Sequence, residues 1–234
     1  MITIRKSEDR GHADHGWLKS HHTFSFAGYN DPEQMGFRSL RVINDDWVAP
    51  GRGFGAHAHR DMEILSYVLE GKLAHKDSMG HVEVLGPNEI QKMSAGNGVI
   101  HSEFNGSESE PVHFLQIWIE TNSTGTAPAY EQIAFQPEEK HLRLKVLAPS
   151  APVEGAVQIQ QDAEMAAAEL TPNSRVTRAL VPGRAAWLHV VRGEVELNGQ
   201  VLRNGDSAAV QAEESLEIVG TGTQNAEVLL FDLA

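Results

Sequence analysis

Apolar and polar residues alternate over short stretches along most of this 234-residue chain, and the pattern predicts strands rather than helices. Residues 40–43, 62–69 and 113–119 are apolar runs rich in strand-forming residues, and each is too short for an independent helix. Glycine and proline interrupt the chain about every ten residues, a spacing typical of β-sandwiches and β-barrels. We therefore expect an all-β protein.

The strand pattern occurs twice. Residues 64–71 run into a glycine turn, and residues 187–193 repeat this arrangement in the second half of the chain. In the second copy, Asn198-Gly199 lies between alternating apolar positions and predicts a hairpin turn. We predict two related β-domains, residues 1–125 and 126–234, joined near the polar segment 121–128. The residues after that segment are alternatively a connector that crosses between the halves.

One segment fits the repeat less clearly. Residues 160–170 have a composition that favours a helix, since alanine and glutamate dominate it. The neighbouring Val157 and Ile159 alternate with polar residues as they would in a strand. The repeat favours the strand, which we predict here.

Charge and hydropathy exclude several classes of partner. The chain carries 19 Lys and Arg against 32 Asp and Glu, a net charge of −13. Non-specific nucleic-acid binding depends on clustered positive charge, so we expect no direct nucleic-acid partner. No stretch approaches the ~18 uninterrupted apolar residues of a membrane helix, and the N-terminal residues lack the apolar segment of a signal peptide. We expect a cytoplasmic protein that does not bind membranes and is a monomer.

Histidine is the one abundant residue type that binds metals. The chain has no cysteine, which excludes disulfides, thiolate nucleophiles, zinc–thiolate sites and iron–sulfur clusters. Ten of the 12 histidines lie at or before His113, so the first half is rich in them and the second half is poor. Any metal chemistry is therefore expected in the first half.

Two pairs of residues have the spacing of metal ligands. His57 and His59 are two residues apart, as are His101 and Glu103, and in a strand such pairs point to the same face. Gly96-Asn97-Gly98 supplies a tight turn into the second pair. Two adjacent strands would bring together three imidazoles and one carboxylate. Such a set suits Fe(II), Ni(II), Mn(II), Cu(II) or Zn(II), and it leaves positions open for substrate or dioxygen.

The same residues resemble the two motifs of the cupins. The first is Gly51-x5-His57-x-His59-x3-Glu63, and the second is Gly98-x2-His101-x3-Asn105. The match has two departures, since Gly71 falls one residue late and Gly96 replaces the expected proline. Glu103, the run from Ser94 to Glu103, and His22-Thr-Phe-Ser-Phe26 narrow the resemblance to the pirin family, and especially to its bacterial members. The resemblance covers nearly the whole chain, including the repeat.

The pirin resemblance implies a bicupin, with two β-barrel (jelly-roll) domains of which only the N-terminal one binds a metal. The implied ligands are His57, His59, His101 and Glu103, and the implied metal is a single divalent ion, Fe(II) before Ni, Mn, Cu or Zn. Glu63, a ligand in many cupins, is not one in this family, so a supporting or structural role is left to it. The implied reaction is that of quercetin 2,3-dioxygenases, in which dioxygen opens a flavonol ring and carbon monoxide is released. Glu103 is also our candidate for the base that deprotonates the flavonol 3-hydroxyl.

Other histidines and aromatics have plainer interpretations. His12, His15, His21 and His22 are a weaker candidate for a second metal site, and we expect them at the surface or at the mouth of a pocket. Three further histidines have no partner at ligand spacing: His75, His81 and His113. Three aromatic residues are expected in the core or at the pocket mouth: Trp17, Phe24 and Phe26. The second repeat has no His-x-His motif, so we expect a metal-free barrel there.

The motifs leave three functions open. The first is a dioxygenase acting on a flavonol-like aromatic. The second is a metal-binding regulatory protein that acts through protein contacts, as a pirin-type transcription cofactor or sensor, because the same four ligands serve both. The third is another cupin reaction, such as an isomerase or a different dioxygenase, which the Glu103 signature disfavours.

Overall fold

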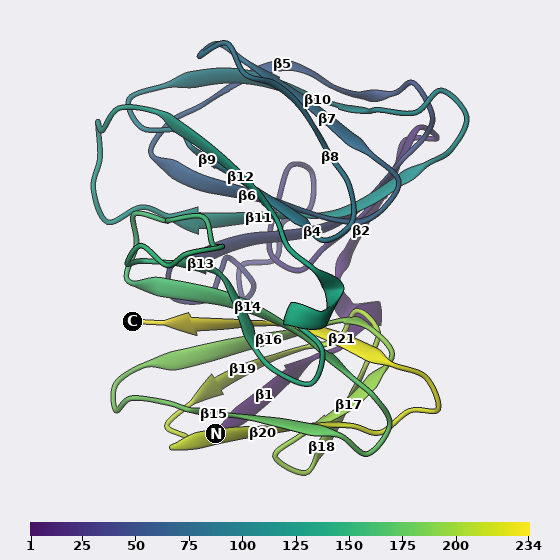
Figure 1. The fold of residues 1–234 in the computed structure, drawn as a ribbon, viewed down its shortest axis with the longest axis vertical. Helices are drawn as coiled ribbons and strands as arrows, with labels where there is room; N and C mark the ends of the chain where they lie inside the picture. The colour runs from purple at the N-terminus through teal and green to yellow at the C-terminus, as the bar shows by residue number, and fades with distance from the viewer. The chain divides into compact units, whose positions relative to one another are not determined.

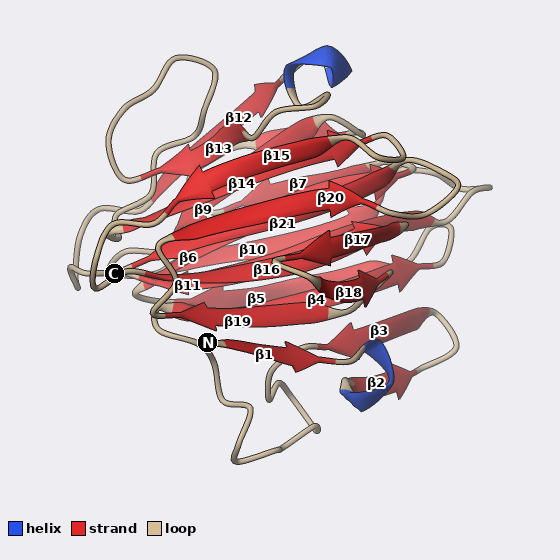
Figure 2. Ribbon diagram, turned by 90° about the horizontal axis from the view of Figure 1, so that it is seen from below, coloured by secondary structure: helices blue, strands red, loops and turns tan.

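The computed structural model describes residues 1–234, and strands account for nearly all of its regular structure (Figures 1 and 2). The all-β prediction is confirmed, and residues 163–170 form a strand as predicted. The chain divides into two compact units. The N-terminal unit comprises residues 11–135 and 150–161, and the C-terminal unit comprises residues 1–10, 136–149 and 162–234. No helix is both long enough and apolar enough to cross a membrane.

The N-terminal unit is built from two sheets. One has seven strands in the order β12-β9-β6-β11-β4-β3-β2, and the other has four in the order β5-β10-β7-β8. Figure 1 shows β5, β10, β7 and β8 as one layer, with β9, β6, β11 and β4 in the other. The strands are β2 (Gly11–Asp14), β3 (Leu18–His22), β4 (Leu40–Val48), β5 (Gly53–His59), β6 (Met62–Glu70), β7 (Leu73–Asp77), β8 (Val82–Leu85), β9 (Glu89–Ser94), β10 (Val99–Asn105), β11 (Val112–Glu120) and β12 (Ala129–Ala134).

The C-terminal unit repeats this arrangement. Its sheets have the orders β1-β19-β16-β21-β14-β13 and β15-β20-β17-β18, so β20 takes the place that β10 has in the first unit. Its elements are β1 (Ile2–Arg5), the 3₁₀ turns η1 (Ser7–Asp9) and η2 (Pro137–Glu139), β13 (Lys145–Pro149), β14 (Ala163–Leu170), β15 (Arg175–Ala179), β16 (Ala185–Arg192), β17 (Glu194–Leu197), β18 (Gln200–Arg203), β19 (Ser207–Gln211), β20 (Ser215–Gly220) and β21 (Ala226–Leu233). The internal repeat therefore corresponds to a repeated sheet topology, that of a bicupin.

The two compact units are not continuous in sequence, unlike the predicted domains 1–125 and 126–234. Strand β1 pairs with β19 and so belongs to the C-terminal unit, although it begins the chain. Strand β12 pairs with β9 in the N-terminal unit, and residues 150–161 also return to that unit. For β1 and β12 the cause is edge-strand pairing, because an edge strand satisfies its backbone hydrogen bonds with whatever sheet it meets, however distant in sequence.

At two predicted turns the backbone has the positive φ angles that the turns require. Asn198 and Gly199 both have positive φ, 45° and 84°, as the two central residues of a type I′ hairpin require. Gly96 has a φ of +48°, and a Cβ at this position would lie 2.3 Å from the carbonyl oxygen of Thr126. Only glycine fits there, so the turn that leads into β10 depends on it.

The cores of the two units differ in a way that bears on function. In the C-terminal unit one continuous cluster of apolar side chains from both sheets fills the interior, and Leu216 and Ile218 of β20 belong to it. In the N-terminal unit the apolar side chains form separate clusters, one around Phe114 and another around Met93. Polar side chains and a cavity occupy part of its interior, and the candidate site lies there.

Candidate metal centre

Strands β5 and β10 bring the two predicted pairs together. They are antiparallel neighbours, with His101 directly opposite His57 and Val99 opposite His59. A bulge between His101 and Glu103 shifts the register of β10 by one position. Such bulges re-aim side chains and are common beside active sites. The prediction that His57, His59 and His101 meet across two adjacent strands is confirmed.

The three imidazoles form a compact group. Their ring centroids lie 4.8 Å apart for His57 and His59, 4.4 Å for His57 and His101, and 4.9 Å for His59 and His101. Their nearest ring nitrogens all lie within 4.8 Å of one another, which is close enough for one ion to bind all three. Three nitrogen donors without a thiolate suit a divalent transition metal.

The hydrogen bonds of these rings also fit a metal. His57 Nδ1 lies 2.8 Å from the carbonyl oxygen of Gly55, so Nδ1 carries the proton and Nε2 keeps its lone pair. His101 is 1% exposed, and neither of its ring nitrogens has a hydrogen-bond partner. A buried polar group without a partner is costly unless a ligand completes it. The His101 nitrogens are therefore free to bind an ion at this position.

Burial keeps two of these imidazoles neutral. It lowers the pKa of His101 to about 3, with further lowering by the neighbouring His57 and His75. It lowers the pKa of His59 to about 4, and the other two histidines of the group add to the effect. A neutral imidazole is the form that binds a metal, so the lone pairs are available at neutral pH.

Glu103 lies beside this group in a fixed orientation. It is 2% exposed, and each of its carboxylate oxygens accepts one hydrogen bond. Ser66 Oγ donates to Oε1 at 3.0 Å, and Gln116 Nε2 donates to Oε2 at 2.7 Å. A carboxylate has about four lone-pair sites, so each oxygen keeps one for a further partner. Ser66 and Gln116 come from β6 and β11, and the sequence pattern alone did not identify them.

His75 is a further residue that the sequence interpretation missed. It has no partner at ligand spacing along the sequence, but the fold places it with His101 and Glu103 in a second group of possible donors. Its two ring nitrogens are already engaged, Nε2 with Asp77 Oδ2 at 3.1 Å and Nδ1 with Gln91 Nε2 at 3.3 Å. His75 therefore packs against the site while its own nitrogens face other partners. It comes from β7, which pairs with β10 on the side away from β5.

Glu63 lies outside both groups of possible metal donors. It lies three residues from the inward-facing Ser66, an odd separation along a strand, so it points to the opposite face of β6. Its Oε2 accepts hydrogen bonds from Ser94 Oγ at 2.9 Å and from the backbone N–H of Gln160 at 3.3 Å. Burial raises its pKa, and those hydrogen bonds oppose the rise. Glu63 thus fastens the returning segment 150–161 to the N-terminal unit.

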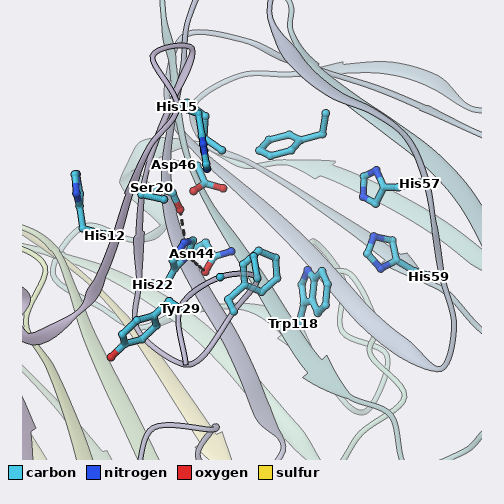
Figure 3. Close-up of a pocket in the computed structure, with 16 residues that line it drawn as sticks. His12, His15, Ser20, His22, Tyr29, Asn44, Asp46, His57, His59 and Trp118 are labelled. Carbon is cyan, nitrogen blue, oxygen red and sulfur yellow. Dashed lines mark hydrogen bonds between the residues drawn. The ribbon is translucent and has the colours of Figure 1, made fainter. Parts of the chain in front are cut away.

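A cavity of about 710 Å³ opens beside the histidines, within the range of about 300–1,000 Å³ for small-molecule sites. His57 and His59 form one side of it, and aromatic rings line much of the rest (Figure 3). Trp118 lies 4.9 Å from His59 between ring centroids, and Phe26 lies 5.3 Å from Trp118. The full lining comprises His12, Ala13, His15, Leu18, Ser20, His22, Phe26, Ala27, Gly28, Tyr29, Asn44, Asp46, Phe54, His57, His59 and Trp118. The cavity is suited to a flat aromatic molecule.

The N-terminal histidines and aromatics divide between this cavity and other surroundings. His12, His15 and His22 line the cavity, whereas His21 packs edge-on against Trp47. Phe26 lines the cavity too, while Phe24 is 1% exposed in the core and Trp17 packs on Phe54. His113 bonds Asp45 and His81 bonds Asp77. None of these histidines and aromatic residues belongs to a candidate group of metal donors.

The fold and the site together define the class of protein. Each unit has the paired sheets of a cupin, so the chain is a bicupin, and the cluster of His57, His59 and His101 in the N-terminal unit is its candidate metal centre. In the C-terminal unit, Leu216 and Ile218 occupy the strand that corresponds to β10 and are fully buried in apolar surroundings.

Comparison with known proteins agrees with this class. The family described as Pirin matches residues 3–119, and the one described as Quercetinase C-terminal cupin domain matches residues 146–233. A quercetin 2,3-dioxygenase of Escherichia coli K12 is 46% identical over 234 residues, which cover 100% of this chain and 99% of that protein. The crystal structure of YhhW from Escherichia coli superposes with a TM-score of 0.95 at 44% identity, covering 100% of this chain and 98% of that one. A structure of the bacterial pirin YhhW in complex with nickel(II) superposes with a TM-score of 0.94 at 43% identity, covering 100% and 99%. The chain belongs to the pirin family.

Proposed function

We propose that this protein is a metal-dependent dioxygenase that opens the ring of a flavonol such as quercetin. The observation that carries the proposal is the buried His101, whose two unpartnered nitrogens lie in a histidine cluster beside an aromatic-lined cavity. The relatives named as quercetin 2,3-dioxygenases support the same reaction. Dioxygen adds across the ring of the flavonol, which yields a depside and one molecule of carbon monoxide.

The proposed ligands are His57, His59, His101 and Glu103, and the proposed metal is Fe(II). Nickel is the ion in the complex of the related YhhW, so Ni(II) is the first alternative to test. A divalent metal held by these residues supplies Lewis acidity and orients an anionic oxygen of the substrate. The residues of the chain accept the substrate's proton, orient its ring system and exclude water.

Glu103 is the proposed proton acceptor. Its carboxylate takes the proton from the 3-hydroxyl of the flavonol, which leaves the substrate as an electron-rich enolate that reacts with dioxygen. Ser66 and Gln116 hold the carboxylate while leaving one lone pair on each oxygen. Trp118 and Phe26 supply the apolar walls that orient the flat ring system and exclude water from the enolate.

The test is turnover by protein loaded with a single defined metal. Apoprotein is loaded separately with Fe(II), Ni(II), Mn(II) or Cu(II), and quercetin consumption and carbon monoxide release are measured under oxygen. We expect turnover with at least one metal, and we expect His101→Ala to lower it about 100-fold or more, because the variant loses a ligand. The matched control is His141→Ala, since His141 is exposed in the C-terminal unit.

Two outcomes would count against the dioxygenase. Turnover that His101→Ala leaves unchanged contradicts the site. Stoichiometric metal binding without turnover for any of the four metals contradicts the reaction and favours a metal-binding regulatory protein.

A further inference from the structure

The side of the cavity opposite His57 and His59 is polar, and the proposed chemistry makes no use of it. Four residues form this polar wall: Ser20, His22, Asn44 and Asp46. They come from the adjacent strands β3 and β4, where Ser20 lies opposite Asp46 and His22 lies opposite Asn44. Figure 3 shows the four side chains together on one side of the cavity, with His57 and His59 on the other.

All four members of the polar wall are linked by hydrogen bonds. His22 Nδ1 lies 2.8 Å from Asn44 Oδ1 and 3.2 Å from Ser20 Oγ. The amide oxygen of Asn44 is an acceptor, so His22 Nδ1 carries the proton and donates it. The Ser20 side chain in turn bonds Asp46. The network thereby fixes the position of the Asp46 carboxyl group.

Asp46 is the member of this network that has an oxygen atom without a hydrogen-bond partner. It is 4% exposed, and its Oδ1 is buried without a hydrogen-bond partner. Burial raises the pKa of Asp46 to about 7, the Ser20 hydrogen bond opposes the rise, and the nearby Asp45 and Glu103 add to it. A buried carboxyl oxygen without a partner is costly, and proteins retain such groups mainly at functional sites.

The surroundings of Asp46 indicate which chemical group completes it. The neighbouring cavity walls are the aromatic rings Phe26, Phe54 and Trp118, so the occupant is a flat aromatic molecule. A carboxyl group repels an anionic substituent and binds a hydroxyl, because the hydroxyl supplies the missing hydrogen bond. The fitting partner is therefore a phenolic hydroxyl on the part of the molecule that lies away from the histidines.

We propose that Asp46 selects the substrate by binding a phenolic hydroxyl on an outer ring of the flavonol, remote from the histidine cluster. This inference rests on the proposed function, because it assumes that a flavonol occupies the cavity. It adds a residue that recognises the outer-ring hydroxyls of such a flavonol.

Asp45 provides a matched control on the same strand. It precedes Asp46 on β4 and so points to the opposite face. Its Oδ1 lies 2.7 Å from His113 Nε2, and Asp45 does not line the cavity. Asp45→Asn therefore removes an acidic group from β4 and leaves the side chains of the polar wall in place. Because Asp45 also raises the pKa of Asp46, binding is measured at pH 8, where Asp46 is ionised with or without Asp45.

The experiment compares two flavonols. Quercetin carries hydroxyls on both outer rings, whereas 3-hydroxyflavone carries only the 3-hydroxyl. Dissociation constants of both are measured by titration calorimetry on nickel-loaded protein without oxygen, for wild type, Asp46→Leu, Asp46→Asn and Asp45→Asn. Metal content and melting temperature of each variant are measured alongside, and KM and kcat are measured wherever turnover is found.

We expect wild type to bind quercetin more tightly than 3-hydroxyflavone. At pH 8, where Asp46 is mostly ionised, Asp46→Leu should weaken quercetin binding about 10- to 100-fold, the range for a hydrogen bond to a charged group, and should change 3-hydroxyflavone binding by less than about twofold. Asp46→Asn should fall between wild type and Asp46→Leu, because the amide keeps an acceptor oxygen. Asp45→Asn should match wild type, and any loss of turnover in Asp46→Leu should lie in KM rather than in kcat.

Two results would overturn this role for Asp46. One is wild type binding both flavonols equally well, and the other is Asp46→Leu weakening both equally. Neither depends on catalysis, since binding is measured without oxygen. A protein that binds quercetin through Asp46 but never consumes it would contradict the dioxygenase reaction and leave the recognition intact.

Discussion

The clamp on Glu103 offers a direct way to test whether this carboxylate belongs to the metal centre. Gln116 Nε2 donates to Glu103 Oε2 at 2.7 Å, and both side chains are buried. In Gln116→Leu the side chain keeps a similar size but loses the donor. Glu103 then retains only the bond from Ser66 to its other oxygen. The carboxylate is free to rotate away from the histidines.

The magnitude follows from the chemistry of that bond. A hydrogen bond to a charged group contributes about 1.5–3 kcal/mol, because the charge strengthens it. Each ~1.4 kcal/mol changes an equilibrium constant about tenfold, so the metal dissociation constant should rise about 10- to 100-fold. Replacing a group that orients a metal ligand typically has an effect of the same size.

The assay is a competition between protein and a chromophoric chelator for Ni(II), and for Fe(II) under anaerobic conditions. The control is Gln158→Leu, an equivalent change at an exposed glutamine in the same unit. If Gln116→Leu keeps the wild-type melting temperature and binds both metals with an unchanged dissociation constant, Glu103 is not a ligand that depends on this clamp.

Two further predictions concern stability. Asn105 is 5% exposed and makes three hydrogen bonds to backbone groups at 2.8–3.0 Å. Asn105→Ala should therefore lower the free energy of unfolding by about 3 kcal/mol and the melting temperature by about 6–12 °C. The control is Asn97→Ala at an exposed position, and equal melting temperatures for the two variants would contradict this. Burial raises the pKa of Asp206, but hydrogen bonds from the Arg203 and Ser7 backbone and from Lys6 outweigh it and hold the pKa below the ordinary 3.8. The stabilisation by the Asp206 carboxylate is therefore fully present above about pH 3.8 and is lost as the pH falls through the lower folded-state pKa. The difference in melting temperature between wild type and Asp206→Asn should close in acid. A difference that stays constant with pH would refute this reasoning.

The local features of the fold could be predicted because each depends on neighbours in sequence. Strand alternation places His57 and His59 on one face, whatever the rest of the chain does. The Asn198-Gly199 hairpin follows from the positive φ angles that this turn requires. The repeat of the strand pattern predicted two related domains, and both units have the same strand order.

Long-range pairing could not be predicted in this way. Strand β1 and the segment 150–161 each join the unit that is remote from them in the sequence. Backbone hydrogen bonding to β19 places β1, and backbone groups are the same at every residue. The segment 150–161 is held by the Glu63 carboxylate, which accepts a hydrogen bond from the Gln160 backbone, and by burial of Val157 and Ile159. No side-chain pattern distinguishes one sheet edge from the other.

In the candidate site, too, some features could be predicted from the sequence and others depend on long-range contacts. The available residue types follow from the sequence alone: the chain has no cysteine, and ten of its 12 histidines lie at or before His113. The i, i+2 pairs that strand geometry aligns follow from it too. The contacts by which Ser66 and Gln116 hold Glu103, from positions 37 and 13 residues away in sequence, arise only in the folded protein. Only the structure showed that His75 packs against the site and that Asp46 is buried with an unused oxygen. The physical reason is that burial and hydrogen-bond partners are set by strands meeting across the sheets, whereas the direction of a side chain along one strand is set by the backbone of that strand alone.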